Sequence, residues 1–376
     1  MVEWNSSPTL LVLACLVTLT SVLWVTKTRN QITPMLRLKR LIDRGREISK
    51  ESGYIVNKNW TDGEGVDWVG GSIVAELIPT SQQRIPLLMA RQHQATGPLP
   101  VVFVLHGTSR SKSCTAVTSV MARYAKKGWA AISFDSRYHG ERSLLATGDY
   151  ELSGKWEAEM SKGSREAPYQ QALVDAFRGS GEQPFIFDAA FDLMRCIDFV
   201  ERNPDMFQAS RIGATGISLG GMIVWLTAVV DPRLKVAAPA IGVQGFQYAI
   251  DSNAFGARVD SIRPVFEAAQ ADLGRGEIDG AVVAAVWDKI TPGLREYFDA
   301  PKSLGLIAPR PLLLLQGGKD PRCPIPGVQA AFDAAQSKYA SLGFKENIRL
   351  FVDEDAGHQV TPLMWEKADQ WFEKHL

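Results

Sequence analysis

Residues 213–221 read Gly-Ala-Thr-Gly-Ile-Ser-Leu-Gly-Gly, a glycine-rich stretch with a single serine. A short strand candidate precedes it, and the apolar, helix-competent run 222–230 follows it. Inside the stretch, Gly216-x-Ser218-x-Gly220 has the pattern of a serine held in a sharp turn between a strand and a helix. Small flanking residues let the strand and helix approach closely, and the helix N-terminus favours negative charge near the hydroxyl. The stretch predicts a nucleophilic serine; a glycine-rich turn with a capping serine is the alternative.

The composition is that of an ordinary globular protein. The 376 residues are 45% hydrophobic and 22% charged, enough for one large domain or two smaller ones. The 41 basic and 41 acidic residues balance, and the sequence has no RNP-like or zinc-finger pattern, so we expect no nucleic-acid partner. The four cysteines are widely spaced, and the five histidines form no H-E-x-x-H motif. We therefore expect no disulfide framework, no metal and no other cofactor.

The N-terminal residues predict attachment to a membrane. The run 10–25 is apolar and uncharged, and with its flanks it approaches the roughly 20 residues of a spanning helix. Residues 1–9 contain no Lys or Arg, whereas seven basic residues lie between Lys27 and Arg46. This distribution predicts an anchor within 1–30 and a cytosolic body at the endoplasmic reticulum or another endomembrane. A cleaved signal peptide, with a secreted or lumenal body, is the alternative.

Residues 31–65 are expected to form a basic juxtamembrane segment and a loop. Apolar and basic residues interleave over 34–49, as in an amphipathic helix that lies on a membrane or packs on the protein. The stretch 57–71 is rich in Gly, Asp and Asn and predicts a loop.

Strands and helices alternate through the remaining segment, 66–376, which we expect to be one domain. Continuous apolar runs, typical of strands buried on both faces, occur at 99–105, 130–134, 234–241, 311–315 and 348–352. Helical patterns lie between them, for example at 114–127 and 328–342. This alternation predicts an α/β fold with a mostly parallel central sheet and helices on both faces. The largely helical stretch 242–300 predicts a helical lid insertion.

Three polar residues follow separate strand candidates. They are Ser218, Asp320 beyond strand 311–315, and His358 beyond strand 348–352. Because the carboxyl ends of parallel strands gather at one edge of a sheet, we expect the three to meet there. His358 would take the proton of Ser218, and Asp320 would hold the imidazole tautomer. The sequence therefore predicts a Ser-His-Asp triad.

Together these motifs resemble the serine hydrolases of the α/β-hydrolase superfamily, in particular its dienelactone-hydrolase, acetyl-xylan-esterase and prolyl-oligopeptidase groups. The resemblance rests on the serine turn, the chain order of the triad, and the motifs His106-Gly107, Asp135-x-Arg137-x-His139-Gly140, Gly318-x-Asp320-x-x-Cys323-Pro324 and Gly357-His358. It implies hydrolysis of an ester, thioester or amide of a small acyl compound through an acyl-enzyme. It also implies an oxyanion hole formed by the backbone N–H groups of Leu219 and Thr108, with Gly107 as the alternative second donor.

Some assignments stay open at this stage. We interpret His106, Asp135, Arg137 and His139 as structural residues that brace a turn, and a role for His139 as an alternative base is the other interpretation. A non-catalytic receptor with the same pocket and an acyltransferase are the alternative functions. Aromatic residues in the segment 242–300 suit either an apolar acyl substrate or ordinary packing of the insertion.

Overall fold

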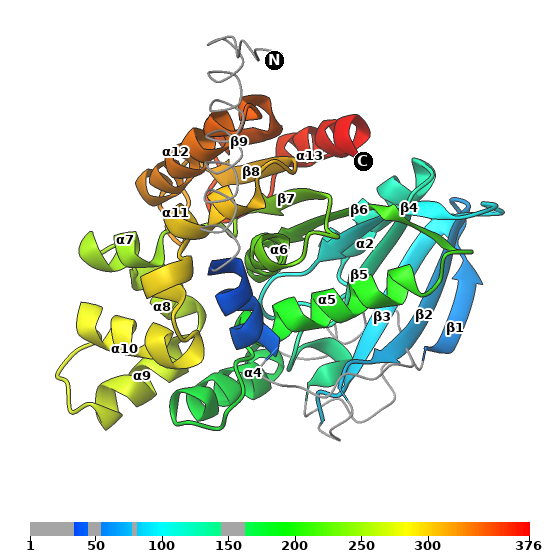
Figure 1. Cartoon of the computed structure of the whole chain (residues 1–376). Helices are drawn as coiled ribbons and strands as arrows, with labels where there is room; N and C mark the ends of the chain where they lie inside the picture. The colour runs from blue at the N-terminus through cyan, green and yellow to red at the C-terminus, as the bar shows by residue number, and fades with distance from the viewer. Residues whose placement is uncertain (1–33, 44–53, 77–80, 144–161) are drawn as a thin grey trace, which may run out of the picture.

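The structure is a computed structural model that describes residues 34–43, 54–76, 81–143 and 162–376 (Figure 1). Its strands form one sheet in the order β1-β2-β3-β5-β4-β6-β7-β8-β9. The antiparallel part consists of β1 (Ile55–Thr61), β2 (Val66–Val74) and β3 (Arg84–Gln92), and β3 also pairs antiparallel with β5. The parallel part consists of β5 (Ala130–Phe134), β4 (Leu99–Leu105), β6 (Phe207–Ile217), β7 (Val236–Ala240), β8 (Leu312–Gly317) and β9 (Ile348–Asp353). The predicted mostly parallel sheet is confirmed.

Helices cover both faces of this sheet. One face carries α5 (Phe187–Glu201), α6 (Leu219–Val230) and α12 (Ile325–Ser341), and the other carries α2 (Thr115–Lys126) and α13 (Pro362–His375). Strand β4 is apolar at every position because both of its faces are covered. Phe103 and Leu105 belong to the core on the first face, whereas Val102 and Val104 belong to the core on the second. Since successive side chains of a strand point to opposite faces, a strand buried on both sides needs apolar residues at every position.

The predicted insertion between β7 and β8 is helical. It contains α7 (Phe246–Asp251), α8 (Gly256–Ser261), α9 (Arg263–Asp272), α10 (Gly280–Ile290) and α11 (Ala300–Ser303). Helices α8, α9 and α10 lie near α4 (Lys162–Phe177), at the lower left of Figure 1. The short turns η1 (Gly140–Arg142), η2 (Leu294–Phe298), η3 (Leu304–Ile307) and η4 (Lys345–Asn347) complete the described elements. That the insertion acts as a lid stays a prediction.

Aromatic residues of the insertion pack on one another. The ring of Trp287 lies 5.2 Å from that of Phe246 and 5.3 Å from those of Phe266 and Phe185, measured between ring centroids. All four side chains are buried. These contacts are those of an ordinary aromatic core, so they do not point to an apolar acyl pocket.

The predicted membrane anchor is contradicted. In the described parts of the chain, no helix has the length and apolar character to cross a bilayer. The apolar run 10–25 and the rest of the segment 1–30 lie outside the described residues. We inferred a transmembrane helix, a membrane partner and an endomembrane location from these residues. The structure does not support these three predictions, and we withdraw them.

The helix expected over 34–49 is present over 34–43, and it packs on the protein. Leu38 and Ile42 are fully buried in the core on the first face of the sheet. The guanidinium of Arg37 lies 3.9 Å from the centroid of the Tyr297 ring. Because protein already covers its apolar side, the helix follows the packing interpretation and not the membrane-surface one.

The stretch 57–71 differs from the expected loop. Most of it belongs to β1 and β2, which pair with each other along their lengths. Gly71 shows why a glycine can be needed within a strand, because an added Cβ there would lie 2.4 Å from the carbonyl oxygen of Ile55. Glycine here permits a close approach of two strands and does not mark a turn.

Candidate active site

Strand β6 ends and helix α6 begins around Ser218. The backbone of this residue has a φ of 55° and a ψ of −107°, a conformation that residues other than glycine rarely adopt. An added Cβ at Gly216 would lie 2.5 Å from the carbonyl carbon of Gly220, and one at Gly220 would lie 2.5 Å from the carbonyl oxygen of Leu105. Strand, turn and helix are therefore packed too closely for larger residues, and this packing holds Ser218 in its strained conformation.

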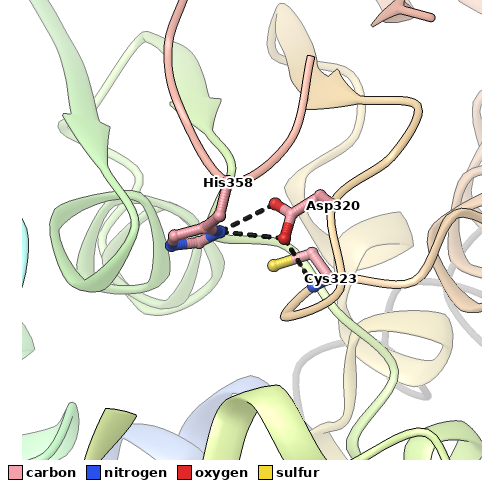
Figure 2. Close-up of side chains that lie close together, drawn as sticks. All are labelled: Asp320, Cys323 and His358. Carbon is pink, nitrogen blue, oxygen red and sulfur yellow. Dashed lines mark hydrogen bonds and ion pairs between the residues drawn. The ribbon is translucent and has the colours of Figure 1, made fainter. Parts of the chain in front are cut away.

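The structure brings Ser218, His358 and Asp320 into one line of hydrogen bonds. His358 lies beyond β9 and Asp320 beyond β8, so all three residues come from the carboxyl ends of parallel strands. The Nε2 atom of His358 lies 2.8 Å from Oγ of Ser218. Its Nδ1 atom lies 2.8 Å from Oδ2 and 3.0 Å from Oδ1 of Asp320 (Figure 2). Since a carboxylate can only accept, Nδ1 carries the proton and Nε2 is the acceptor that faces the serine hydroxyl.

Burial and charge set the protonation of this pair. Burial lowers the pKa of His358, the hydrogen bond and charge of Asp320 oppose that shift, and the charges of Arg258 and Arg322 add to it. Burial by itself would raise the pKa of Asp320, but the hydrogen bond and charge of His358 and two backbone N–H groups lower it overall. At neutral pH the pair is therefore an ionised carboxylate and a neutral imidazole, which is the state a general base requires.

Cys323 supports Asp320 from the other side. The N–H groups of Arg322 and Cys323 donate to Oδ1 of Asp320 at 2.8 Å and 3.2 Å. The thiol of Cys323 donates to the carbonyl oxygen of Ile241, with Sγ and O 3.3 Å apart. Ligand atoms of Asp320, Cys323 and His358 lie within 4.8 Å of one another, close enough to hold a metal ion (Figure 2). Burial, however, raises the pKa of the thiol to about 12, and metals bind the thiolate, so these residues fit a hydrogen-bonded support better than a metal site.

The two predicted oxyanion donors lie on either side of the serine. Leu219 is the first residue of α6, where the N–H has no partner within the helix. Thr108 follows Gly107, where an added Cβ would lie 3.6 Å from Cβ of Ser218. Within the described residues, the N–H groups of Leu219 and Thr108 donate to no protein acceptor. Their position suits an oxyanion hole, and that role stays a prediction.

His106 and His139 make structural contacts. The Nδ1 atom of His106 donates to the carbonyl oxygen of Gly107 at 2.8 Å, and Nε2 accepts the N–H of Ser136 at 3.1 Å, so the ring ties the Thr108 loop to the end of β5. His139 donates from Nδ1 to the carbonyl oxygen of Arg137 at 2.8 Å. Burial lowers the pKa of His139 to about 3, and among the described residues the hydroxyl of Ser218 donates to Nε2 of His358 and not to His139. This geometry gives no support to His139 as an alternative base.

Buried ion pairs brace the turn after β5. Nζ of Lys112 lies 2.7 Å from Oδ2 of Asp135, and both side chains are almost fully buried. The guanidinium of Arg137 contacts Asp192 at 3.1 Å and also pairs with Glu76. The structural interpretation of Asp135 and Arg137 agrees with these contacts.

A polar cavity of about 150 Å³ lies beside the serine turn. Its lining comes from the Thr108 loop, from α4, from α8 and from the turn after Asp320, and consists of Thr108, Ser109, Arg110, Arg165, Glu166, Asp260, Ser261 and Arg322. Sequence reasoning missed the charged members, because none of them is a defined position of a recognised motif. The one available signal was the position of Arg322 inside the Gly318-x-Asp320-x-x-Cys323 motif.

The fold defines the class of this protein. The chain belongs to the alpha/beta hydrolase family, whose family model matches residues 101–374. Three esterase structures have a similar fold. Acetyl xylan esterase 1 from a Thermoanaerobacterium species is 15% identical, with 90% of this chain and 92% of that chain covered and a TM-score of 0.60. An acetyl xylan esterase from a Paenibacillus species is 18% identical, with 91% and 93% covered and a TM-score of 0.55. A glucuronoyl esterase from Solibacter usitatus is 14% identical, with 90% and 91% covered and a TM-score of 0.54.

One curated protein is also similar in sequence. It is the hydrolase YtaP of Bacillus subtilis, which is 27% identical over 186 residues. The alignment covers 50% of this chain and 52% of YtaP, so it spans about half the length of that relative.

Proposed function

We propose that this protein is a serine hydrolase that cleaves carboxylic esters, thioesters or amides through an acyl-enzyme. The observation that carries the proposal is the unbroken hydrogen-bonded line from Asp320 through His358 to Ser218, on a strained strand-to-helix turn. The names of the esterases with a similar fold support an ester as the substrate.

In the proposed mechanism, Oγ of Ser218 attacks the substrate carbonyl while Nε2 of His358 takes its proton. Asp320 keeps the imidazole in the tautomer that exposes Nε2 and stabilises the imidazolium once it forms. The N–H groups of Leu219 and Thr108 donate to the oxyanion of the tetrahedral intermediate. The imidazolium then gives its proton to the leaving alcohol, thiol or amine, and a water molecule activated by His358 hydrolyses the acyl-enzyme.

The test is a panel of esters of graded acyl length with wild-type protein and the Ser218→Ala variant. We expect the variant to lose at least about 10³-fold in kcat, as when the nucleophile of a triad is removed. Ser337→Ala, on the exposed surface of α12, is the matched control and should behave as wild type. Hydrolysis by Ser218→Ala within tenfold of wild type would refute the assignment of the nucleophile.

Labelling by a fluorophosphonate probe separates the enzyme from a receptor with the same pocket, because only an activated serine reacts. We expect covalent labelling of wild type at Ser218 and none of Ser218→Ala. Adding alcohol acceptors to the acyl-enzyme then separates hydrolysis from acyl transfer. Predominant formation of a new ester over free acid would favour the acyltransferase.

A further inference from the structure

Arg258 of helix α8 is an arginine buried beside the triad without an acidic partner. Its side chain is only 3% exposed. One terminal nitrogen donates to the carbonyl oxygen of Arg322 at 3.4 Å and lies 3.6 Å from Sγ of Cys323. Its Nε atom is buried without any hydrogen-bond partner, and no carboxylate of the described residues forms an ion pair with it. A buried cation without a counter-charge is costly, so its presence calls for an anion that the described residues do not supply.

Arg322 places a second cation next to Arg258. It is half-buried and lines the 150 Å³ cavity, and its guanidinium makes no hydrogen bond or ion pair within the described part of the chain. The two arginines are neighbours, because Arg258 donates to the backbone carbonyl oxygen of Arg322. Burial and the charge of Arg258 lower the pKa of Arg322, and the charges of Asp320 and Asp260 oppose that shift. An anion between or beside the two arginines would relieve the repulsion between their charges.

The neighbouring acids already have partners. Both oxygens of Asp320 bind His358, and Oδ1 also accepts two backbone N–H groups. Asp260, at the end of α8, pairs with Arg263 on the surface. On the other wall of the cavity, Glu166 accepts the hydroxyl of Ser109 at 2.5 Å. Asp320 and Asp260 act on Arg322 through their charge, but none of these carboxylates forms an ion pair with Arg258 or Arg322.

The hydroxyl of Tyr169 adds an uncharged donor to the group. It is buried, has no hydrogen-bond partner, and lies close enough to Arg258 for that charge to lower its pKa against a larger rise caused by burial. Together these groups supply hydrogen-bond donors and positive charge close to the triad, because the two arginines act on His358 and Arg322 shares a cavity lining with Thr108. Such a set is suited to a carboxylate, sulfate or phosphate group, which arginine binds through paired N–H donors.

We propose that Arg258 and Arg322 bind an anionic group of the substrate, so that this enzyme prefers esters with a negatively charged group near the scissile bond. The inference rests on the proposed esterase function and names its substrate class. The anionic group belongs either to the acyl part or to the alcohol part of the ester. In both cases it would bind the guanidinium groups through the same charge-assisted hydrogen bonds.

Two matched pairs of esters test the preference and locate the anion. For the acyl part, para-nitrophenyl hemisuccinate is compared with the neutral para-nitrophenyl methyl succinate. For the alcohol part, para-acetoxybenzoate is compared with its neutral methyl ester. We expect wild type to favour the anionic member of at least one pair by about 10- to 100-fold in kcat/KM, the range of a charge-assisted hydrogen bond. No preference in either pair, with the neutral esters hydrolysed, would overturn the proposal and leave the esterase function intact.

The variant for this test is Arg322→Gln. Arg322 is half-buried, so its replacement threatens folding less than replacement of the buried Arg258 would. We expect it to lose most of the preference, so that kcat/KM falls further for the anionic ester than for the neutral ester of the same pair. Arg322→Lys should restore part of the preference, and Arg349→Gln is the matched control, because among the described residues this exposed arginine at the start of β9 pairs only with Glu346 on the surface. An equal decrease for both members of a pair would show that Arg322 is only structural.

A pH profile and a binding measurement complete the test. Arg258, Arg322 and Asp320 are the charged groups that act on His358, so Arg322→Gln should raise the pKa of His358 and move the acid limb of kcat/KM to higher pH. A moved limb would show that the charge of Arg322 reaches His358, and an unmoved limb would place Arg322 too far from the triad for the proposed role. If wild type hydrolyses no ester, the esterase proposal fails, and calorimetric titration of Ser218→Ala with succinate tests the anion site alone. Binding that Arg322→Gln abolishes supports the site; no binding, or equal binding to both proteins, overturns it.

Discussion

Replacement of Asp320 by Asn tests which carboxylate acts on His358. The wild-type side chain is fully buried and holds Nδ1 of His358 with both oxygens, at 2.8 Å and 3.0 Å. An Asn oxygen can still accept the N–H groups of the following turn, so the fold should remain intact. Its amide group, however, donates, and Nδ1 would then become the acceptor. The proton would move to Nε2, which faces Ser218 and could no longer accept the serine proton.

We expect this wrong tautomer to lower kcat by about 10³- to 10⁴-fold, or about 4 to 5.5 kcal/mol of transition-state stabilisation. The assay is steady-state hydrolysis of the best ester of the panel, with thermal unfolding of both proteins as the check on folding. The control is Asp355→Asn, which changes a carboxylate near His358 in sequence. Its side chain is 93% exposed and pairs with Lys319 at 2.7 Å, so we expect less than a twofold change. Equal losses in the two variants, or a greater loss in Asp355→Asn, would refute the reasoning.

Three further predictions follow from particular contacts. Gly220→Ala should lower the free energy of unfolding by at least about 1–3 kcal/mol in a denaturant titration, because its Cβ would overlap the Leu105 carbonyl, whereas Gly276→Ala has open space and should not. His358 must be neutral to act as the base, and burial lowers its pKa. We therefore expect kcat/KM to fall as pH drops, with the midpoint of the fall below about pH 6.5, and a midpoint above pH 7 would contradict this. Lys112→Met should cost about 3–5 kcal/mol of unfolding free energy, because it leaves the buried Asp135 carboxylate without its ion pair; an unchanged denaturation midpoint would argue against that role.

Local sequence was sufficient to predict the core of the fold. Strands β4 and β5 were recognisable because a strand covered on both faces must be apolar at every position. The turn at Ser218 was recognisable because only glycine fits at positions 216 and 220. The order of Ser218, Asp320 and His358 along the chain, each after its own strand, was enough to predict that they meet. In such cases the physical constraint acts on residues near one another in sequence.

The tertiary structure decided the features that depend on distant partners. The sequence 57–71 suggests a loop until the β1–β2 pairing shows why Gly71 must lack a side chain. The helix 34–43 has the pattern of a membrane-surface helix, and only the core that buries Leu38 and Ile42 shows which surface it covers. Arg258 belongs to no motif, and its contact with Cys323 joins residues 65 positions apart. The effect of a charged side chain depends on the groups packed around it. For Arg258 these groups come together only when helix α8 packs against the turn after β8.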